Sequence, residues 1–185
     1  MLNPDGVIYG NYRCSLLGVD LNRRWINPSK ILHPTIHYTK QIIKMLDLDR
    51  TIDLFTDIHG HSRKYNVFMY GCAFPEISID SRNNSIIKVL PSILNDRVEA
   101  FKMKDCKFAL EKEKESTARI VLFKELQIVN SYTMEASFFG TEPEEVVKNN
   151  EENENEDEED SNCGGSGGED DDNSPRKDDN INNKQ

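Results

Sequence analysis

Apolar side chains recur at helical spacing in three stretches of the chain. Residues 35–46 carry them on one face, and Pro34 stands at a position that suits a helix start. Residues 80–101 follow a mostly helical pattern that breaks near Pro91, and residues 116–126 repeat the helical spacing. The pattern therefore predicts three helices, separated by segments of a different character.

The most informative of those segments is a run of apolar, β-favouring residues at 52–58, which predicts a buried strand. It leads into His59, Gly60 and His61, where glycine permits tight backbone geometry. Imidazoles are good zinc ligands, and α/β proteins place their ligand crevices at the ends of strands. These residues alone support a metal site and an ordinary loop with two histidines equally.

Three further segments, at 66–71, 106–110 and 131–139, have strand character. In the last, alternation puts Glu135 on a polar face with its Ser and Thr neighbours, and Tyr132 on an apolar face. Such a glutamate is a candidate general base, although a carboxylate that faces water from an edge strand fits the pattern equally. Helices that alternate with strands predict an α/β fold: a mixed β-sheet flanked by helices.

The charge of the chain is unevenly distributed. The 185 residues carry a formal net charge of -10, and 36% of them are hydrophobic, enough for one domain with a core. Residues 151–172 hold 12 acidic residues and no Lys or Arg, so the remainder is nearly neutral. We predict a folded domain over residues 1–141 and a disordered acidic tail over residues 142–185, which lack apolar periodicity.

Composition also excludes several classes of protein. The four cysteines show no C-x-x-C spacing, which favours reduced thiols in a cytoplasmic protein. The sequence has no signal peptide and no run of 18 apolar residues, so we expect neither secretion nor a membrane partner. It has no Gly-x-Ser-x-Gly elbow, no phosphate-binding glycine loop and no basic patch for nucleic acid.

Two short pairs of polar residues are candidate sites. Asn22 and Arg23 form a pair suited to gripping a carboxylate, although solvated surface arginines beside the lone Trp25 are the better-supported interpretation on these residues alone. His33 and His37 stand four residues apart, but no Glu or Cys accompanies them. We expect these two histidines to lie on the surface at a helix start.

Taken together, five segments in one order resemble the zinc carboxypeptidases of the carboxypeptidase A type. More narrowly, they resemble the cytosolic carboxypeptidases that trim glutamates from protein C-termini and side chains. Each segment is weak evidence alone, whereas five in the same order do not arise readily by chance. The segments are Asn3-Pro4-Asp5-Gly6, Gly10-Asn11-Tyr12-Arg13, Asp20-Leu21-Asn22-Arg23, residues 57–62 with 66–71, and Ser131-Tyr132-Thr133-Met134-Glu135; Ser116-Thr117-Ala118-Arg119 also fits the cytosolic branch.

The resemblance implies roles for the matched residues around a catalytic Zn²⁺. His59 matches the downstream histidine ligand of the zinc, whereas His61 matches no ligand. Glu135 matches the glutamate that activates the zinc-bound water and passes its proton to the leaving amine. Arg13 matches the arginine that stabilises the tetrahedral oxyanion.

The same resemblance implies how substrate is held. Asn22 and Arg23 match the pair that binds the terminal carboxylate of the substrate. Arg119, expected in the first turn of a helix capped by Ser116, matches a specificity-pocket position where positive charge favours a C-terminal Glu or Asp. Asp20 matches the carboxylate that orients the upstream zinc histidine.

The sequence departs from the family in one respect that matters. The zinc site of the family needs an upstream His-x-x-Glu motif, which is absent from these 185 residues, so we expect an N-terminally incomplete domain. The expected function is zinc-dependent hydrolysis of C-terminal amino acids, chiefly glutamates of acidic protein tails such as those of tubulin, in the cytoplasm or at microtubules and cilia. The alternative is a catalytically inactive relative that binds acidic C-terminal tails.

Overall fold

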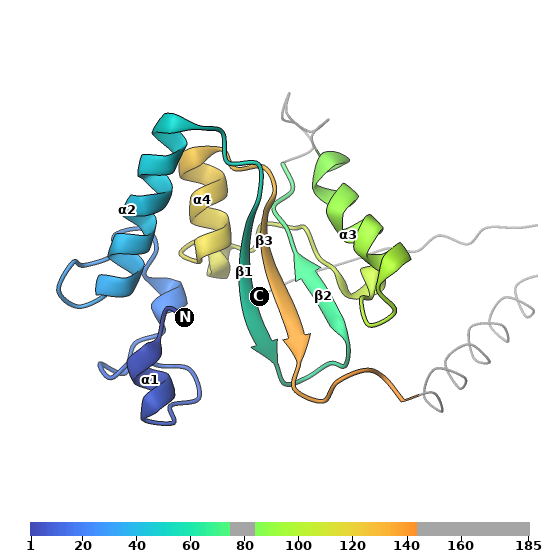
Figure 1. The fold of residues 1–185 in the computed structure, drawn as a ribbon, viewed down its shortest axis with the longest axis horizontal. Coiled ribbons are helices and arrows are strands. Elements are labelled where there is room, and N and C mark those ends of the chain that lie inside the picture. Colours follow the sequence, from blue (N-terminus) through green and yellow to red (C-terminus); the bar gives the residue numbers. More distant parts are fainter. Residues whose placement is uncertain (75–83, 144–185) are drawn as a thin grey trace, which may run out of the picture. The chain divides into compact units, whose positions relative to one another are not determined.

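A three-stranded sheet in the order β1-β3-β2 forms the centre of the computed structural model (Figure 1). Its strands are β1 (Phe55–His61), β2 (Val67–Tyr70) and β3 (Ser131–Ser137). Strand β3 runs parallel to β1 and antiparallel to β2, so the sheet is mixed, as predicted.

The structure describes residues 1–74 and 84–143, of which Met1–Glu142 form one unit. The predicted acidic tail at 142–185 lies outside the described residues except for its first two positions. The part of the predicted helix before residue 84 lies outside them as well.

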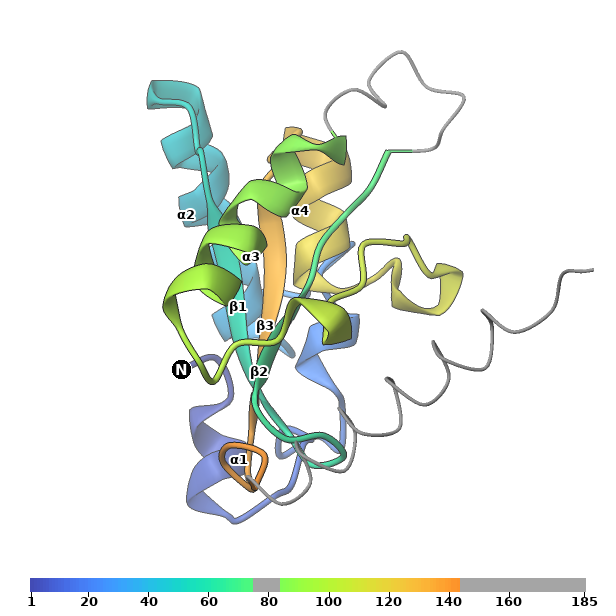
Figure 2. The ribbon, with the colours of Figure 1, turned by 90° about the vertical axis from the view of Figure 1, so that its right-hand side faces the viewer.

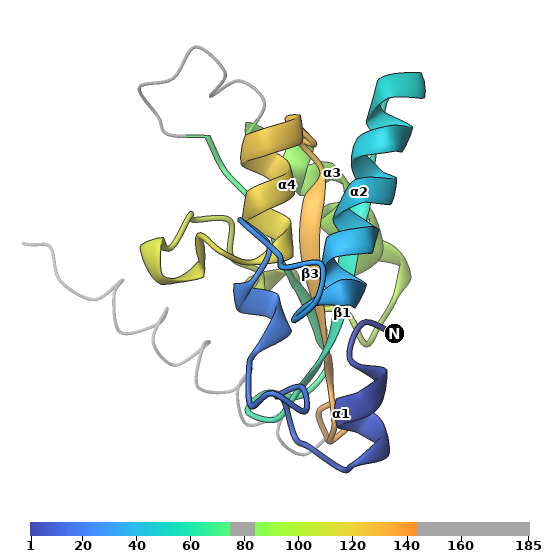
Figure 3. The same cartoon turned by 90° about the vertical axis from the view of Figure 1, so that its left-hand side faces the viewer.

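Within the described residues, four α-helices accompany the sheet. They are α1 (Pro4–Ile8), α2 (Pro34–Asp49), α3 (Ile86–Arg97) and α4 (Ala118–Leu126). Figure 2 shows α3 in front of one face of the sheet, and Figure 3 shows α2 and α4 in front of the other. The α/β fold class, a sheet flanked by helices, is therefore confirmed.

Most of the helix predictions hold, with local differences. The segment Asn3-Pro4-Asp5-Gly6 contains the start of α1, because the side chain of Asn3 accepts a hydrogen bond from the Gly6 N–H at 3.2 Å and caps the helix. Helix α4 begins one residue later than predicted, with Thr117 rather than Ser116 at the N-cap position.

Pro91 does not break α3 as predicted but lies buried inside it. A proline removes the N–H that would bond the carbonyl four residues earlier, here that of Ile87. The hydroxyl of Tyr132 donates to this carbonyl at 2.8 Å, so a core side chain replaces the hydrogen bond that the helix backbone cannot make. The predicted strand at 106–110 is reduced to an isolated bridge between Tyr70 and Lys107.

Two burial predictions were wrong. Strand β1 is an edge strand, and the side chain of Ile58 is 72% exposed, because nothing in the described part of the chain pairs with its outer edge. A continuous apolar run does not reveal how many neighbours a strand has. His33 is buried rather than on the surface, and its Nδ1 accepts a hydrogen bond from the Ser29 N–H at 3.1 Å.

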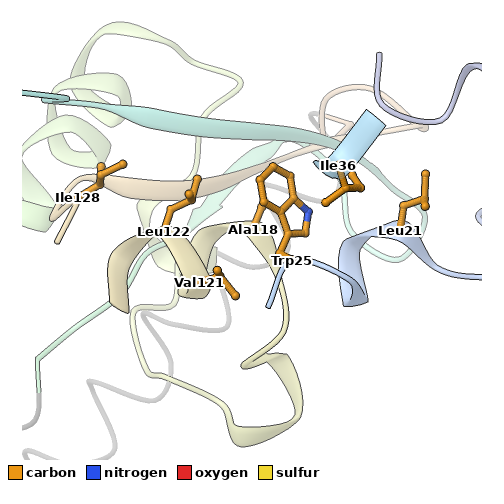
Figure 4. Packing of buried hydrophobic residues seen from close by; sticks show 7 residues of the cluster. All are labelled: Leu21, Trp25, Ile36, Ala118, Val121, Leu122 and Ile128. Carbon is orange, nitrogen blue, oxygen red and sulfur yellow. The ribbon is translucent and has the colours of Figure 1, made fainter. Parts of the chain in front are cut away.

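The core on the α2 and α4 side is built around Trp25, which is 1% exposed. Figure 4 shows its indole among side chains from α2, α4 and the short 3-10 helix η1 (Leu21–Arg23). This packing anchors η1, and with it Asn22 and Arg23, against the sheet. The cluster consists of Leu21, Trp25, Ile36, Ala118, Val121, Leu122 and Ile128.

The opposite face has its own core of Met69, Phe101 and Tyr132, against which residues of α3 pack. Within residues 1–74 and 84–143, no helix has the length and apolar character needed to cross a membrane.

Candidate active site

One cavity of about 480 Å³ lies beside β1 and β3 and collects side chains from distant parts of the chain. Each position to which the resemblance gives a role in binding or catalysis lines it: Arg13, Asn22, Arg23, His59, Arg119 and Glu135. The structure therefore brings all six together, from the loop after α1, η1, both parallel strands and α4.

The two parallel strands place His59 and Glu135 side by side. They are direct partners in the register between β1 and β3, and Glu135 has the buried Thr133 as a neighbour on the same face. Burial raises the pKa of Glu135 above its usual value, and the charges of His59 and His61 offset this only in part. A half-buried carboxylate with a raised pKa is suited to accepting a proton.

His59 is held by a carboxylate two residues earlier on the same strand face. Its Nε2 lies 2.7 Å from Asp57 Oδ2, and this hydrogen bond raises the pKa of His59 against the opposing effect of burial. An ionised carboxylate can only accept, so Nε2 donates and the neutral ring carries its lone pair on Nδ1. The motif contained this signal, because residues at i and i+2 of a strand share a face, but sequence reasoning did not assign a role to Asp57.

Asn22 joins three elements through its side chain and backbone. Its Nδ2 donates to Asp57 Oδ2 at 3.3 Å, and its Oδ1 accepts from the Ala118 N–H, at the start of α4, at 3.0 Å. Its own N–H donates to Asp20 Oδ1 at 2.9 Å. The amide thus positions β1, η1 and α4 relative to one another at the edge of the cavity.

The carboxylate of Asp20 lies close to the guanidinium groups of two arginines that line the cavity. Its Oδ2 lies 3.5 Å from Arg13 Nε and 3.9 Å from Arg23 Nη1. In the part of the chain that the structure describes, Asp20 thus contacts arginines rather than a histidine. The side chain of Arg13 is 50% exposed and that of Arg23 is 31% exposed, so both guanidinium groups can reach a ligand.

Arg119 differs from these arginines because it is only 6% exposed. Its Nη1 donates to the carbonyl of Gly71 and lies 3.5 Å from Cys72 Sγ, while its Cζ lies 5.9 Å from the ring centre of Tyr70. Its Nε is buried with no hydrogen-bond partner, and it makes no ion pair among the described residues.

His61 has a structural contact in the turn after β1. Its Nδ1 accepts hydrogen bonds from the N–H groups of Arg63 and Lys64, both at 3.1 Å. Sequence reasoning excluded His61 as a ligand but did not predict this contact. Tyr70 and Thr133 also line the cavity and were not predicted as site residues.

The zinc ion that the resemblance implies can be tested against these contacts. Nδ1 of His59 offers one lone pair, but a catalytic zinc needs three protein ligands. Across residues 1–74 and 84–143, no group of three His, Cys, Asp or Glu side chains is placed to hold a metal ion. The described residues therefore do not fit a complete zinc site.

No protein-family model matches the chain. Cytosolic carboxypeptidase 1 of Xenopus laevis is 50% identical over an alignment of 152 residues, and the match covers 77% of this chain and 12% of that protein. Human cytosolic carboxypeptidase 4 is 45% identical over an alignment of 150 residues, and the match covers 76% of this chain and 14% of that protein.

Among solved structures, a metallo-carboxypeptidase from Pseudomonas aeruginosa in complex with (2-guanidinoethylmercapto)succinic acid has a TM-score of 0.62 and 27% identity, over 74% of this chain and 35% of that one. The chain thus spans about an eighth of the length of the curated relatives it matches. Over the sequence it shares with these relatives, the chain is similar to the cytosolic carboxypeptidases, and its fold is similar to that of a metallo-carboxypeptidase.

Proposed function

We propose that this chain supplies the substrate-binding and proton-transfer part of a carboxypeptidase active site that acts on acidic C-termini. The observation that carries the proposal is the single cavity lined by Arg13, Arg23, Arg119 and Glu135. Cations that can bind carboxylates lie there beside one half-buried carboxylate that can exchange a proton.

In this proposal, Arg23 binds the terminal carboxylate of the substrate, and Arg13 stabilises the tetrahedral oxyanion. Both guanidinium groups already lie close to the carboxylate of Asp20, at 3.9 Å and 3.5 Å, which supports their approach to an anion. Asn22 acts mainly by holding η1 in place, since both ends of its amide are engaged within the protein.

The acidic side chain of the substrate would be recognised by Arg119 and the start of α4. A buried guanidinium without a carboxylate partner is costly, so an incoming anion gains more there than at an exposed arginine. The N-terminus of α4 adds the positive end of a helix dipole, and its N-cap Thr117 lines the same cavity.

Glu135 would act as general base and return its proton to the leaving amine. The solved structure from Pseudomonas aeruginosa is named a metallo-carboxypeptidase, and we propose that zinc is the metal used with this chain. This chain offers His59 as one ligand, and the other ligands would have to come from outside the described residues.

The proposal also covers the substrate and the cellular location. We propose C-terminal glutamates as the residues removed, with tubulin tails as one substrate class. The relatives are named cytosolic carboxypeptidases, which supports a cytoplasmic location. Association with microtubules or cilia stays a prediction.

The first test measures binding by the full chain with isothermal titration calorimetry. Two peptides of identical sequence are compared, one ending in a free glutamate carboxylate and one ending in the amide. We expect the free acid to bind at least about tenfold more tightly, a difference of about 1.4 kcal/mol, and Arg23→Gln to remove this preference. Equal affinity for the two peptides would contradict the proposed orientation of the substrate.

A second candidate function, binding of acidic C-termini without cleavage, is favoured by the incomplete zinc ligand set. Released glutamate is therefore measured after the chain is incubated with Zn²⁺ and the free-acid peptide. Release that Glu135→Gln abolishes, while binding persists, supports the carboxypeptidase. Selective binding with no release supports the second candidate for this chain by itself, and the absence of binding contradicts both.

A further inference from the structure

Three consecutive residues at the end of β2 contact the guanidinium group of Arg119. Its Nη1 donates to the carbonyl of Gly71, and its Cζ lies 5.9 Å from the ring centre of Tyr70. The third contact is Cys72 Sγ, at 3.5 Å from Nη1. Burial raises the pKa of this thiol to about 11, so it is neutral near pH 7. Two side chains, Tyr70 and Cys72, thus hold the guanidinium group without a negative charge.

The backbone of Tyr70 is fixed on both sides. On one side Tyr70 is the partner of Thr133 in the antiparallel register between β2 and β3. On the other side the N–H of Gly71 donates to the Lys107 carbonyl at 2.9 Å. Residues directly opposite in an antiparallel pair share a face, so the side chain of Tyr70 is on the face of Thr133 and Glu135, and it lines the cavity.

The ring of Tyr70 is the last in a row of three aromatic rings. The rings of His61 and Phe68 meet at 77° with centres 5.0 Å apart, and those of Phe68 and Tyr70 meet at 85° with centres 5.6 Å apart. Edge-to-face contacts of this kind favour one ring orientation. Phe68 is 0% exposed and therefore has little freedom to move. The row gives the Tyr70 ring a defined position beside Arg119.

Tyr70 can hold a cation without neutralising it. Burial raises the pKa of Tyr70 above its usual value, and the charge of Glu135 adds to this, so the hydroxyl keeps its proton near pH 7. The face of a neutral ring attracts a guanidinium group, more strongly where water is excluded. A carboxylate in the same place would form an ion pair with Arg119 and occupy its charge. Arg119 makes no ion pair among the described residues, so its charge is available to a ligand.

We propose that Tyr70 is a positioning residue, whose ring holds Arg119 in the orientation that binds the side chain of the terminal residue of a ligand. The inference rests on the proposed function, in which Arg119 recognises that side chain. A thiol is a weak hydrogen-bond acceptor, so the ring of Tyr70 supplies the main side-chain contact of the guanidinium group. Tyr70 acts through Arg119 and does not itself have to touch the ligand.

Two peptides that differ at one atom group test this role. Both have a free terminal carboxylate, and one ends in glutamate and the other in glutamine. We expect the full chain to bind the glutamate peptide about tenfold more tightly in titration calorimetry, a difference of about 1.4 kcal/mol. Tyr70→Leu and Tyr70→Met each remove the ring and should reduce this ratio to about twofold or less.

A second ratio separates positioning from a general loss of structure. The preference for a peptide with a free terminal carboxylate over its amide depends on Arg23 in the proposed function, so it should survive in both variants that lack the ring. A purely structural defect would reduce both preferences. Circular dichroism confirms folding, and the different shapes of Leu and Met provide a second variant where the first does not fold.

Three further variants complete the test. Tyr70→Phe keeps the ring and should keep the glutamate preference. The control Tyr38→Leu removes a ring from α2 that is 50% exposed and does not line the cavity, and it should change neither ratio. Arg119→Met should abolish the glutamate preference, and adding Tyr70→Leu to it should weaken binding of the glutamate peptide no further, because a residue that acts through another has no effect in its absence.

The inference and the proposed function fail in different ways. A glutamate preference that persists without the ring, or one that is lost in Tyr70→Phe, would overturn the inference alone. A further loss of affinity when Tyr70→Leu is added to Arg119→Met would do the same. Equal affinity of the unmodified chain for the two peptides would instead reject the proposed role of Arg119, and the inference with it.

Discussion

At the scale of single residues, Trp25 has the clearest energetic role. It is 1% exposed and packs among side chains from η1, α2 and α4. Replacing Trp25 by Ala should cost about 3–5 kcal/mol of unfolding free energy, because it leaves a large cavity in a small core. Urea unfolding measures the loss, and Ile26→Ala, at a 49% exposed neighbour, should change stability by less than about 0.5 kcal/mol. Similar losses in the two variants would contradict this view of the core.

A second residue-scale prediction concerns the buried Lys40. Its Nζ donates to Glu125 Oε1 at 2.8 Å and to the carbonyls of Trp25 and Ile26. Burial alone would raise the pKa of Glu125, but the hydrogen bonds from Lys40 and Lys44 outweigh it and lower the pKa from 4.5. A lowered folded-state pKa stabilises the fold above about pH 4.5, and this contribution is lost as the pH falls through the lower value.

Thermal unfolding between pH 3 and pH 6 tests this linkage. Glu125→Gln should flatten the acid limb of the stability profile. The control Glu113→Gln, at an exposed residue that forms no ion pair in the described part of the chain, should leave that limb unchanged. Identical acid limbs in Glu125→Gln and the unmodified chain would rule out the proposed contribution.

The sequence predicted which residues gather at the site better than it predicted their contacts. Glu135 lies on the polar face that alternation indicated, beside His59, as both strands require. The engagement of Asn22 with the Ala118 N–H and Asp57 depends on elements that are far apart in the chain. Alternation and spacing describe one element at a time, so such contacts lie beyond them.

At the scale of elements, the hydrogen bonds of the Asn22 side chain connect η1 with α4 and β1. Asn22→Asp would keep an acceptor for the Ala118 N–H but would remove the donor to Asp57 and place a second carboxylate about 3.3 Å away. We expect a loss of about 1–3 kcal/mol in urea unfolding, from the lost hydrogen bond and the like-charge contact. Adding Asp57→Asn should restore part of the loss, and no recovery in the double variant would argue against direct repulsion.

Strand β1 shows how an element prediction can be right in type and differ in bounds and environment. It begins and ends three residues later than the apolar run at 52–58, so that His59 and His61 lie within it, and it is at the edge of the sheet with Ile58 exposed. Exposed apolar edge strands favour association between chains. Ile58→Lys should therefore lower light scattering at high protein concentration with little change in unfolding temperature. Scattering equal to that of the unmodified chain would show that another surface causes association.

Helix α3 gives the complementary case. The proline signal predicted a break, but the hydroxyl of Tyr132 satisfies the Ile87 carbonyl that Pro91 leaves free. Local sequence rules assume that water or the helix itself must satisfy such groups. A hydrogen-bond donor 45 residues further along the chain changes the outcome, and only the folded arrangement reveals it.

At the scale of the whole molecule, the described unit combines a cationic cavity with a chain whose formal charge is -10. Net charge alone would predict repulsion of acidic ligands, whereas the local arrangement predicts their attraction. The Debye length at 0.1 M salt is about 10 Å, so charges in the cavity wall dominate over distant ones for a bound ligand. Overall composition is therefore a poor guide to the partner of this site.

The order of the strands has a consequence for how the chain acquires its structure. Strand β3 is the last strand along the described chain but occupies the centre of the sheet, between β1 and β2. Loop-closure entropy makes such long-range pairing slow relative to local helix formation. During synthesis from the N-terminus, β1 and β2 therefore remain unpaired until Ser131–Ser137 has left the ribosome. Glu135 lies on this last strand, so it enters the site as the sheet forms.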